Sequence, residues 1–129
     1  MKAYSLGLYE KAMPSELSWR EKLKTAKEAG YDYVEISIDE TEEKIKRLDM
    51  TKEERFTLLS AMYEVELPVR TMCLSALTKY TLGNDDPEYV ARGMEILEKS
   101  IQLADDLGIR VVMIPGYDVY YKPSSVETK

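Results

Sequence analysis

Residues 33–38 read YVEISI, and the alternation in this stretch decides the fold. Side chains point in turn to opposite faces of a strand, so the three β-branched residues of the stretch share one face. The pattern predicts a strand with one apolar face and one small or polar face, namely Val34, Ile36 and Ile38 against Tyr33, Glu35 and Ser37.

Three further stretches, before and after this one, read as strands. They are residues 3–9 (AYSLGLY), 69–74 (VRTMCL) and 109–114 (IRVVMI). Successive strand centres lie roughly 30 to 40 residues apart, which leaves room for a helical crossover and predicts a parallel sheet.

Helix signals fill the intervals between these strands. Residues 18–21 (SWRE) and 51–54 (TKEE) form capping boxes, and Asp86 followed by Pro87 is a typical helix start. The predicted helices span residues 18–29, 51–64 and 88–107. Apolar residues at helical spacing predict the buried sides: Leu23, Ala26 and Ala29 in the first helix, Phe56, Leu59 and Tyr63 in the second, and Val90, Met94, Leu97, Ile101 and Ala104 in the third.

The order of these elements predicts a single α/β domain over residues 1–129. A doubly wound sheet would have near-continuous apolar strands, because helices cover both of its faces. Strands with one small or polar face suit the crowded interior of a barrel better. A whole barrel needs eight units and ~250 residues. We therefore expect half of a TIM-type barrel, a (β/α)4 unit of four parallel strands that stops before a fourth helix.

Composition excludes several classes of protein. The chain has a net charge of −6, so nucleic acid and anionic membrane surfaces are not expected partners. No stretch approaches the ~20 apolar residues of a membrane span, and residues 1–10 do not resemble a signal peptide. Cys73 is the only cysteine and there is no histidine, which fits a cytoplasmic protein and excludes chemistry that needs a histidine base or ligand.

Five segments together carry a resemblance to a known family. They are residues 6–12 (LGLYEKA), 33–40 (YVEISIDE), 72–76 (MCLSA), 108–110 (GIR) and 116–121 (GYDVYY). In order and spacing they resemble the L-xylulose 5-phosphate (L-ribulose 5-phosphate) 3-epimerases, which are xylose-isomerase-like TIM barrels. The resemblance implies a pentulose phosphate substrate, a divalent metal (Mg, Mn or Zn) and proton transfer beside the ketose carbonyl.

The resemblance also implies what this chain lacks. In that group the metal ligands, two Glu, one Asp and one His, lie in the later half of the barrel. We therefore expect no catalytic residue, no metal ligand and no cofactor in this chain. In a completed barrel, five residues at strand ends are expected to contact substrate: Tyr9, Glu10, Cys73, Tyr117 and Asp118.

Three other acidic residues have structural interpretations. Asp39 and Glu40 lie at an acidic helix start, where they are expected to cap the helix and solvate the loop. Glu35 lies in mid-strand on the small-residue face, and a buried carboxylate needs a partner, so we expect an ion pair with Arg70 or Arg110.

Three interpretations of function remain open. The chain is the N-terminal part of a sugar-phosphate 3-epimerase that is inactive alone, a non-catalytic self-assembling fragment, or one half of a split enzyme that needs a second chain. The open edges of four strands predict a homodimer through those edges, which would rebuild an eight-stranded barrel.

Overall fold

The structure is a computed structural model, and it describes residues 2–116. Four parallel strands form one sheet in chain order: β1 (Gly7–Tyr9), β2 (Tyr33–Ser37), β3 (Val69–Cys73) and β4 (Val111–Met113). The register places Leu8 beside Val34, Ile36 beside Met72 and Met72 beside Val112. The expected half-barrel of parallel strands with alternating helices is confirmed.

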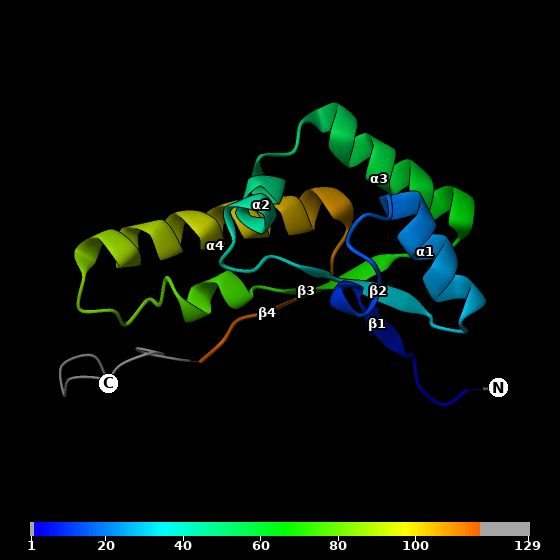
Figure 1. The fold of residues 1–129 in the computed structure, drawn as a ribbon, viewed down its shortest axis with the longest axis horizontal. Helices are drawn as coiled ribbons and strands as arrows, with labels where there is room; N and C mark the ends of the chain where they lie inside the picture. Colours follow the sequence, from blue (N-terminus) through cyan, green and yellow to red (C-terminus); the bar gives the residue numbers. More distant parts are fainter. Residues whose placement is uncertain (1, 117–129) are drawn as a thin grey trace.

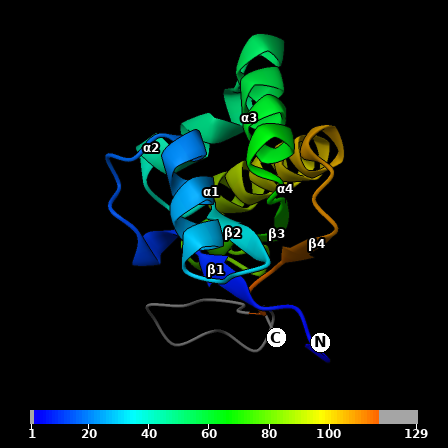
Figure 2. The ribbon, with the colours of Figure 1, turned by 90° about the vertical axis from the view of Figure 1, so that its right-hand side faces the viewer.

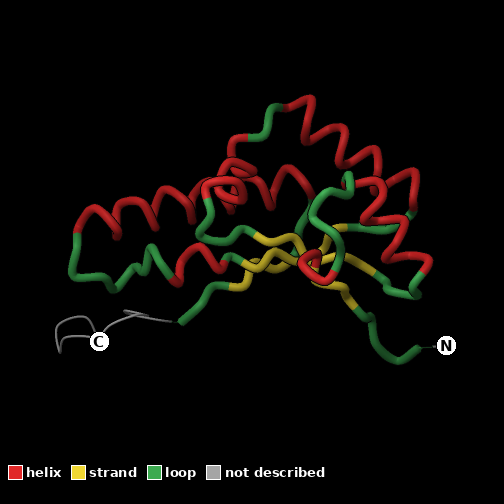
Figure 3. Tube along the Cα trace, in the orientation of Figure 1, coloured by secondary structure: helices red, strands yellow, loops and turns green. Residues whose placement is uncertain are grey.

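Four α-helices follow the strands: α1 (Trp19–Glu28), α2 (Glu42–Ile45), α3 (Lys52–Val65) and α4 (Pro87–Leu107). Three 3₁₀ turns complete the described elements: η1 (Glu10–Ala12), η2 (Lys46–Asp49) and η3 (Ser75–Thr78). The α-helices cover one face of the sheet, as Figures 1 and 3 show, and α3 lies at the outer side of this layer. The other face carries no helix of the described chain.

Local sequence signals fix where the helices begin and end. Both predicted capping boxes form, with Ser18 accepting from the Glu21 amide and Thr51 accepting from the Glu54 amide. Gly108 ends α4 at a φ of 69°, a left-handed conformation that glycine adopts at little cost.

The core lies between the sheet and the helical layer. The predicted apolar face of β2 is confirmed, since Val34 and Ile36 are fully buried, as is Ile38 just beyond the strand. The helices add buried side chains to the same cluster, among them Leu23, Ala26, Leu58, Ile96, Leu103 and Leu107.

The predicted buried side of α3 is wrong. Phe56 is 69% exposed, Leu59 37% and Tyr63 86%, whereas α3 buries Leu58, Ala61 and Met62. Both sets have helical spacing, so periodicity alone does not tell which one faces the sheet.

The predicted stripe of α4 is only partly buried. Met94 and Ile101 are exposed, while Ile96, Leu103 and Leu107 face the core. On one flank of α4, Asp106 pairs with Arg55 of α3, and Lys99 pairs with Asp49 of η2 at 2.8 Å. This flank therefore contacts elements that precede α4 in the chain. The predicted stripe runs along the opposite flank, where a further barrel unit would pack.

Three smaller corrections concern ends of elements. Ala29 is exposed because it caps α1 rather than lying inside it. The first strand begins at Gly7, not Ala3, and the Leu6 amide donates to the Asp32 carboxylate at 2.8 Å instead of joining a ladder. The last strand begins at Val111, later than predicted. None of the described helices is long and apolar enough to cross a bilayer.

Candidate functional site

The carboxyl ends of the strands gather the polar residues that the sequence singled out. Glu10 follows β1, Asp39 follows β2 and Cys73 ends β3. Because the strands are parallel, these ends lie at the same edge of the sheet, which is where barrel enzymes place their active sites.

Glu10 is a buried carboxylate surrounded by cations. Its side chain is 1% exposed, and its Oε1 lies 2.7 Å from Lys44 Nζ and 2.7 Å from Arg47 Nη1. Lys22 Nζ lies 3.7 Å away, and the Ser37 amide donates to Oε2 at 3.1 Å. Burial acts to raise the pKa of Glu10, but Arg47 and Lys44 outweigh it and hold this pKa below its usual value.

These contacts give Glu10 a positioning role in the fold. They join β1 to the end of β2, to α1 through Lys22, and to α2 and η2 through Lys44 and Arg47. A carboxylate with this many partners is held in one place and charged. Contact between Glu10 and a substrate stays a prediction. While Glu10 keeps these partners, it would act on a substrate through them.

Lys22 is the least expected member of this group. It is 3% exposed, and its ammonium lies 5.1 Å from the centre of the Trp19 ring. Burial lowers its pKa, and the nearby charge of Glu10 acts in the opposite direction. The Arg47 guanidinium lies at the same 5.1 Å from this ring, so Trp19 contacts two of the cations.

Tyr9, Ser37 and Cys73 form a smaller polar cluster on the face of the sheet that carries no helix. The Tyr9 hydroxyl donates to Ser37 Oγ at 3.0 Å. Burial raises the pKa of Tyr9, the Ser37 hydrogen bond lowers it, and Cys73 raises it again, with the net result above its usual value. The hydroxyl therefore stays protonated near neutral pH and can donate or accept a hydrogen bond.

Asp39 organises the loop after β2, but the expectation that it caps the helix and solvates the loop is wrong: Thr41 is the N-cap of α2, and Asp39 is buried. Its Oδ1 accepts from the Thr41 amide at 2.9 Å and from the Thr41 hydroxyl at 2.6 Å. Its Oδ2 pairs with Lys11 Nζ at 2.7 Å. Burial acts to raise the pKa of Asp39, but Lys11 and Thr41 lower it overall. Glu40, its neighbour in the sequence, is exposed.

The expected ion pair of Glu35 does not form. Glu35 instead accepts a hydrogen bond from the Thr71 hydroxyl at 2.7 Å, and the Arg70 guanidinium lies 5.5 Å from the Tyr33 ring centre. The register of β2 and β3 shifts between Val34 and Glu35, so that Val34 pairs with Val69 but Glu35 pairs with Thr71. Arg70 is skipped by this shift and is not paired with Glu35.

Two of the five expected contact residues, Tyr117 and Asp118, lie outside the described residues. The described part of the chain also does not fit the divalent metal of the resembled family. Nowhere in residues 2–116 do three histidine, cysteine or acidic side chains come together to hold a metal ion. The absence of a metal site from the whole chain stays a prediction.

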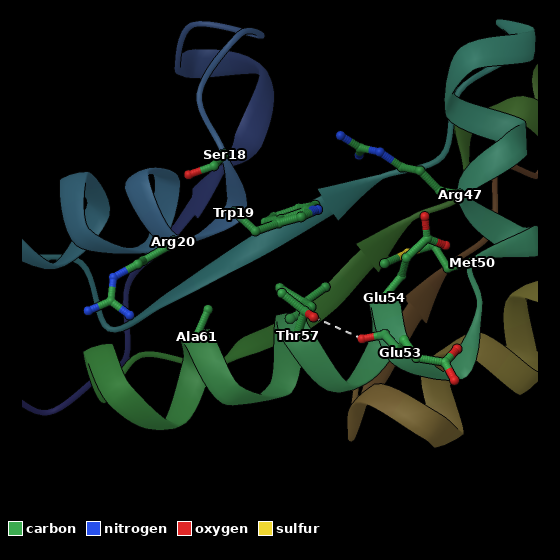
Figure 4. A pocket seen from close by; sticks show the side chains of 10 residues that line it. Ser18, Trp19, Arg20, Arg47, Met50, Glu53, Glu54, Thr57 and Ala61 are labelled. Atoms are coloured by element: carbon green, nitrogen blue, oxygen red, sulfur yellow. Dashed lines mark hydrogen bonds between the residues drawn. The ribbon is translucent and has the colours of Figure 1, made fainter.

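A separate hollow lies on the helical side of the molecule. It measures about 490 Å³ between α1 and α3, and Trp19, Met50, Leu58 and Ala61 are among its lining residues. Figure 4 shows Trp19 and Arg47 on one side of it and α3 on the other. The lining residues do not include Tyr9, Ser37 or Cys73, but Arg47 also pairs with Glu10, so one wall of the hollow adjoins the cations around Glu10.

Sequence comparison gives relatives of known activity. A family model described as "xylose isomerase-like TIM barrel" matches residues 23–128. The L-ribulose-5-phosphate 3-epimerase UlaE of Shigella boydii serotype 18 and that of Escherichia coli strain SE11 are each 47% identical over 128 residues. The match takes in 99% of this chain and 45% of each relative, so the chain spans about half the length of the curated relatives it matches.

Solved structures share the fold at lower identity. The 3-keto-D-glucoside 4-epimerase YcjR from E. coli superposes with a TM-score of 0.66 at 24% identity, over 86% of this chain and 37% of that one. A D-allulose 3-epimerase from Methylomonas sp., in complex with D-allulose, superposes with a TM-score of 0.65 at 23% identity, over 96% and 42%. At this identity the likeness concerns the fold alone.

Proposed function

Because the chain belongs to the xylose isomerase-like TIM barrel family, we propose that it forms the first half of the barrel of a sugar-phosphate 3-epimerase. The substrate class is a pentulose phosphate such as L-ribulose 5-phosphate or L-xylulose 5-phosphate. The observation that carries this proposal is the 47% identity, over 128 residues, to L-ribulose-5-phosphate 3-epimerases.

The chemistry assigns a limited part to the described residues. Epimerisation beside a carbonyl needs a base, an acid and a cation to stabilise the enediolate charge. The two buried strand-end carboxylates, Glu10 and Asp39, already pair with cations and are unsuited to move a proton. Tyr9 and Cys73 instead bind and orient the sugar, with Tyr117 and Asp118 contributing from the tail. The acid–base pair and metal ligands come from the second half of the barrel.

Activity assays test this division of labour. The purified chain, incubated with L-xylulose 5-phosphate and Mg²⁺, Mn²⁺ or Zn²⁺, should show no epimerisation. Co-expression with the second half of the E. coli relative should restore metal-dependent turnover. Turnover by the chain alone would overturn the assignment of the catalytic groups. Failure of an assembled, folded complex to turn over would count against the substrate class.

Tyr9 gives a sharper version of the test. In the reconstituted enzyme, Tyr9→Phe removes one hydroxyl at the sugar face and should lower kcat/KM about tenfold or more. Tyr4→Phe is the matched control, since Tyr4 is 68% exposed and lies outside the strand-end cluster. Equal activity of the two variants would remove Tyr9 from the binding surface.

The second candidate is a non-catalytic, self-assembling chain. The observation in its favour is the pair of edge strands, since in the described sheet β1 pairs only with β2 and β4 only with β3. Such edges invite pairing with another chain. If the chain assembles with itself but never with the second half of a relative, this candidate is the better one. Assembly only with a separate half-barrel chain would favour a split enzyme.

A further inference from the structure

An apolar stripe runs along the outer surface of α3. Its three apolar residues, Phe56, Leu59 and Tyr63, are 69%, 37% and 86% exposed. Within α3 they follow Lys52 at an alternating spacing of four, three and four residues, and Glu66, the C-cap of the helix, comes three residues after Tyr63. That spacing is the heptad pattern with which one helix packs along another.

The described elements of the barrel leave this stripe uncovered. The opposite side of α3 packs on the core through Leu58, Ala61 and Met62. The neighbouring positions in the helical layer are already filled, by α1 on one side and α4 on the other, as Figure 2 shows. The exposed apolar residues of α4, such as Ile101, are a different case. They lie on the flank of α4 against which a following barrel unit would pack.

The surface beside the stripe is hollowed. One groove of about 450 Å³ is lined by Phe56, Leu59, Ser60, Tyr63 and Glu64. A second, of about 680 Å³, lies on the other side and is lined by Leu59, Met62, Tyr63, Glu64, Glu66, Leu67 and Pro68. The stripe is therefore a ridge between two grooves, the shape into which a second ridge fits.

We propose that α3 docks on α3 of a second copy of this chain, antiparallel, about a two-fold axis close to Leu59. The charges at its two ends argue for this occupant. An antiparallel arrangement places Lys52 of each copy beside Glu66 of the other, giving two opposite-charge pairs. A parallel arrangement would place like charges together. The contact is self-complementary, as a two-fold interface requires.

The contact is small. One helix against another lies at or below the low end of specific interfaces, near ~1,200 Å² of total buried area. We therefore expect a reversible dimer that forms at micromolar concentrations or above. This contact is independent of the proposed enzymatic function and of pairing through the strand edges, because it uses the outer face of the helical layer.

Sedimentation equilibrium of the full chain over a range up to several hundred micromolar tests the proposal. Leu59→Glu should raise the dissociation constant of this dimer by at least ~10-fold. Leu82→Glu is the matched control, because Leu82 is 39% exposed against 37% for Leu59 and lies away from α3. A chain without self-association, or one that Leu59→Glu leaves unchanged, would overturn the proposal.

Charge reversal tests the antiparallel register. Lys52→Glu or Glu66→Lys alone should weaken the dimer about two- to fivefold per pair, and the double variant should restore it. Glu66 also pairs with Lys27 of its own copy at 3.4 Å, but both side chains are exposed and that pair contributes little. A double variant no better than the single ones would show that the register is wrong. Circular dichroism confirms that each variant is folded.

Discussion

At the scale of single residues, the stability of the strand-end region depends on one buried carboxylate facing three cations. Glu10→Gln keeps the shape of the side chain but leaves Lys22, Lys44 and Arg47 together without an anion. Removing one partner of a buried ion pair typically costs about 3–5 kcal/mol. We expect a loss of unfolding free energy in this range, measured by urea denaturation.

The matched control is Glu28→Gln in α1. Glu28 lies 3.9 Å from Lys24 in an exposed pair, and such pairs contribute about 0.5 kcal/mol or less. Equal effects of the two substitutions would show that the cluster around Glu10 adds no more than a surface pair does.

The same residue predicts how stability changes with acid. The pKa of Glu10 is lower in the folded protein than in the unfolded chain, and that of Asp39 is lowered as well. Their contribution is therefore fully present above the unfolded values, about 4. It is lost as the pH falls through the folded values. Urea unfolding from pH 7 to pH 2 should show this loss, and Glu10→Gln should make it shallower. An unchanged slope in the variant would contradict the assignment.

Sequence alone located the strand-end residues but not their partners. Tyr9, Glu10 and Cys73 could be placed together because the ends of parallel strands meet at one edge. Lys44 and Arg47 could not be assigned to Glu10 from the sequence. Both lie more than thirty residues after Glu10, and no spacing rule links residues that far apart. Lys22 carried one weak signal, its position four residues before the buried Ala26 on α1.

At the scale of elements, α4 contains two small residues whose replacement by alanine should have opposite effects. In an exposed helix, Gly→Ala stabilises by about 1 kcal/mol. A Cβ at Gly93, however, would lie 2.3 Å from the backbone oxygen of Tyr80, and this oxygen cannot move without its loop. Gly93→Ala should therefore destabilise the protein, by about 1–3 kcal/mol.

Ser100 lies on the same helix, and its replacement by alanine should have the opposite effect to that of Gly93. It is fully buried, and its hydroxyl has no hydrogen-bond partner in the described structure. Ser100→Ala should stabilise the protein by about 1 kcal/mol, since an unpaired buried hydroxyl is unfavourable. Thermal unfolding of both variants checks the signs. Stabilisation by Gly93→Ala would mean that α4 and the loop at Tyr80 are less closely packed than described.

Element starts were predictable where a local hydrogen bond defines them, as in the capping boxes of Ser18 and Thr51. The buried faces of α3 and α4 were not. Their exposed apolar residues are as periodic as the buried ones, and only the neighbouring elements decide which set is covered. Glu35 was misjudged for a related reason, since the shifted register of β2 and β3 cannot be read from either strand alone.

At the scale of the whole molecule, the sheet formed by residues 2–116 has two unpaired edges, and the helices of this part of the chain leave one of its faces uncovered (Figure 1). We propose that two copies close an eight-stranded barrel, with β4 of each beside β1 of the other. Light scattering gives the mass of the assembly, and a crystal structure gives the pairing. A monomer at micromolar concentration, or a dimer without these strand pairs, would show the arrangement to be wrong.

The order of the strands has a consequence for how the protein is made. Neighbours in the sheet are neighbours in the chain, so each strand leaves the ribosome directly after the one it pairs with. Glu10 meets its last partner once Arg47 has emerged, before any of β3 has left the ribosome. At ~5–20 residues per second, about two to seven seconds separate successive units. The nascent chain can thus lock its first two strands while the rest is still being translated.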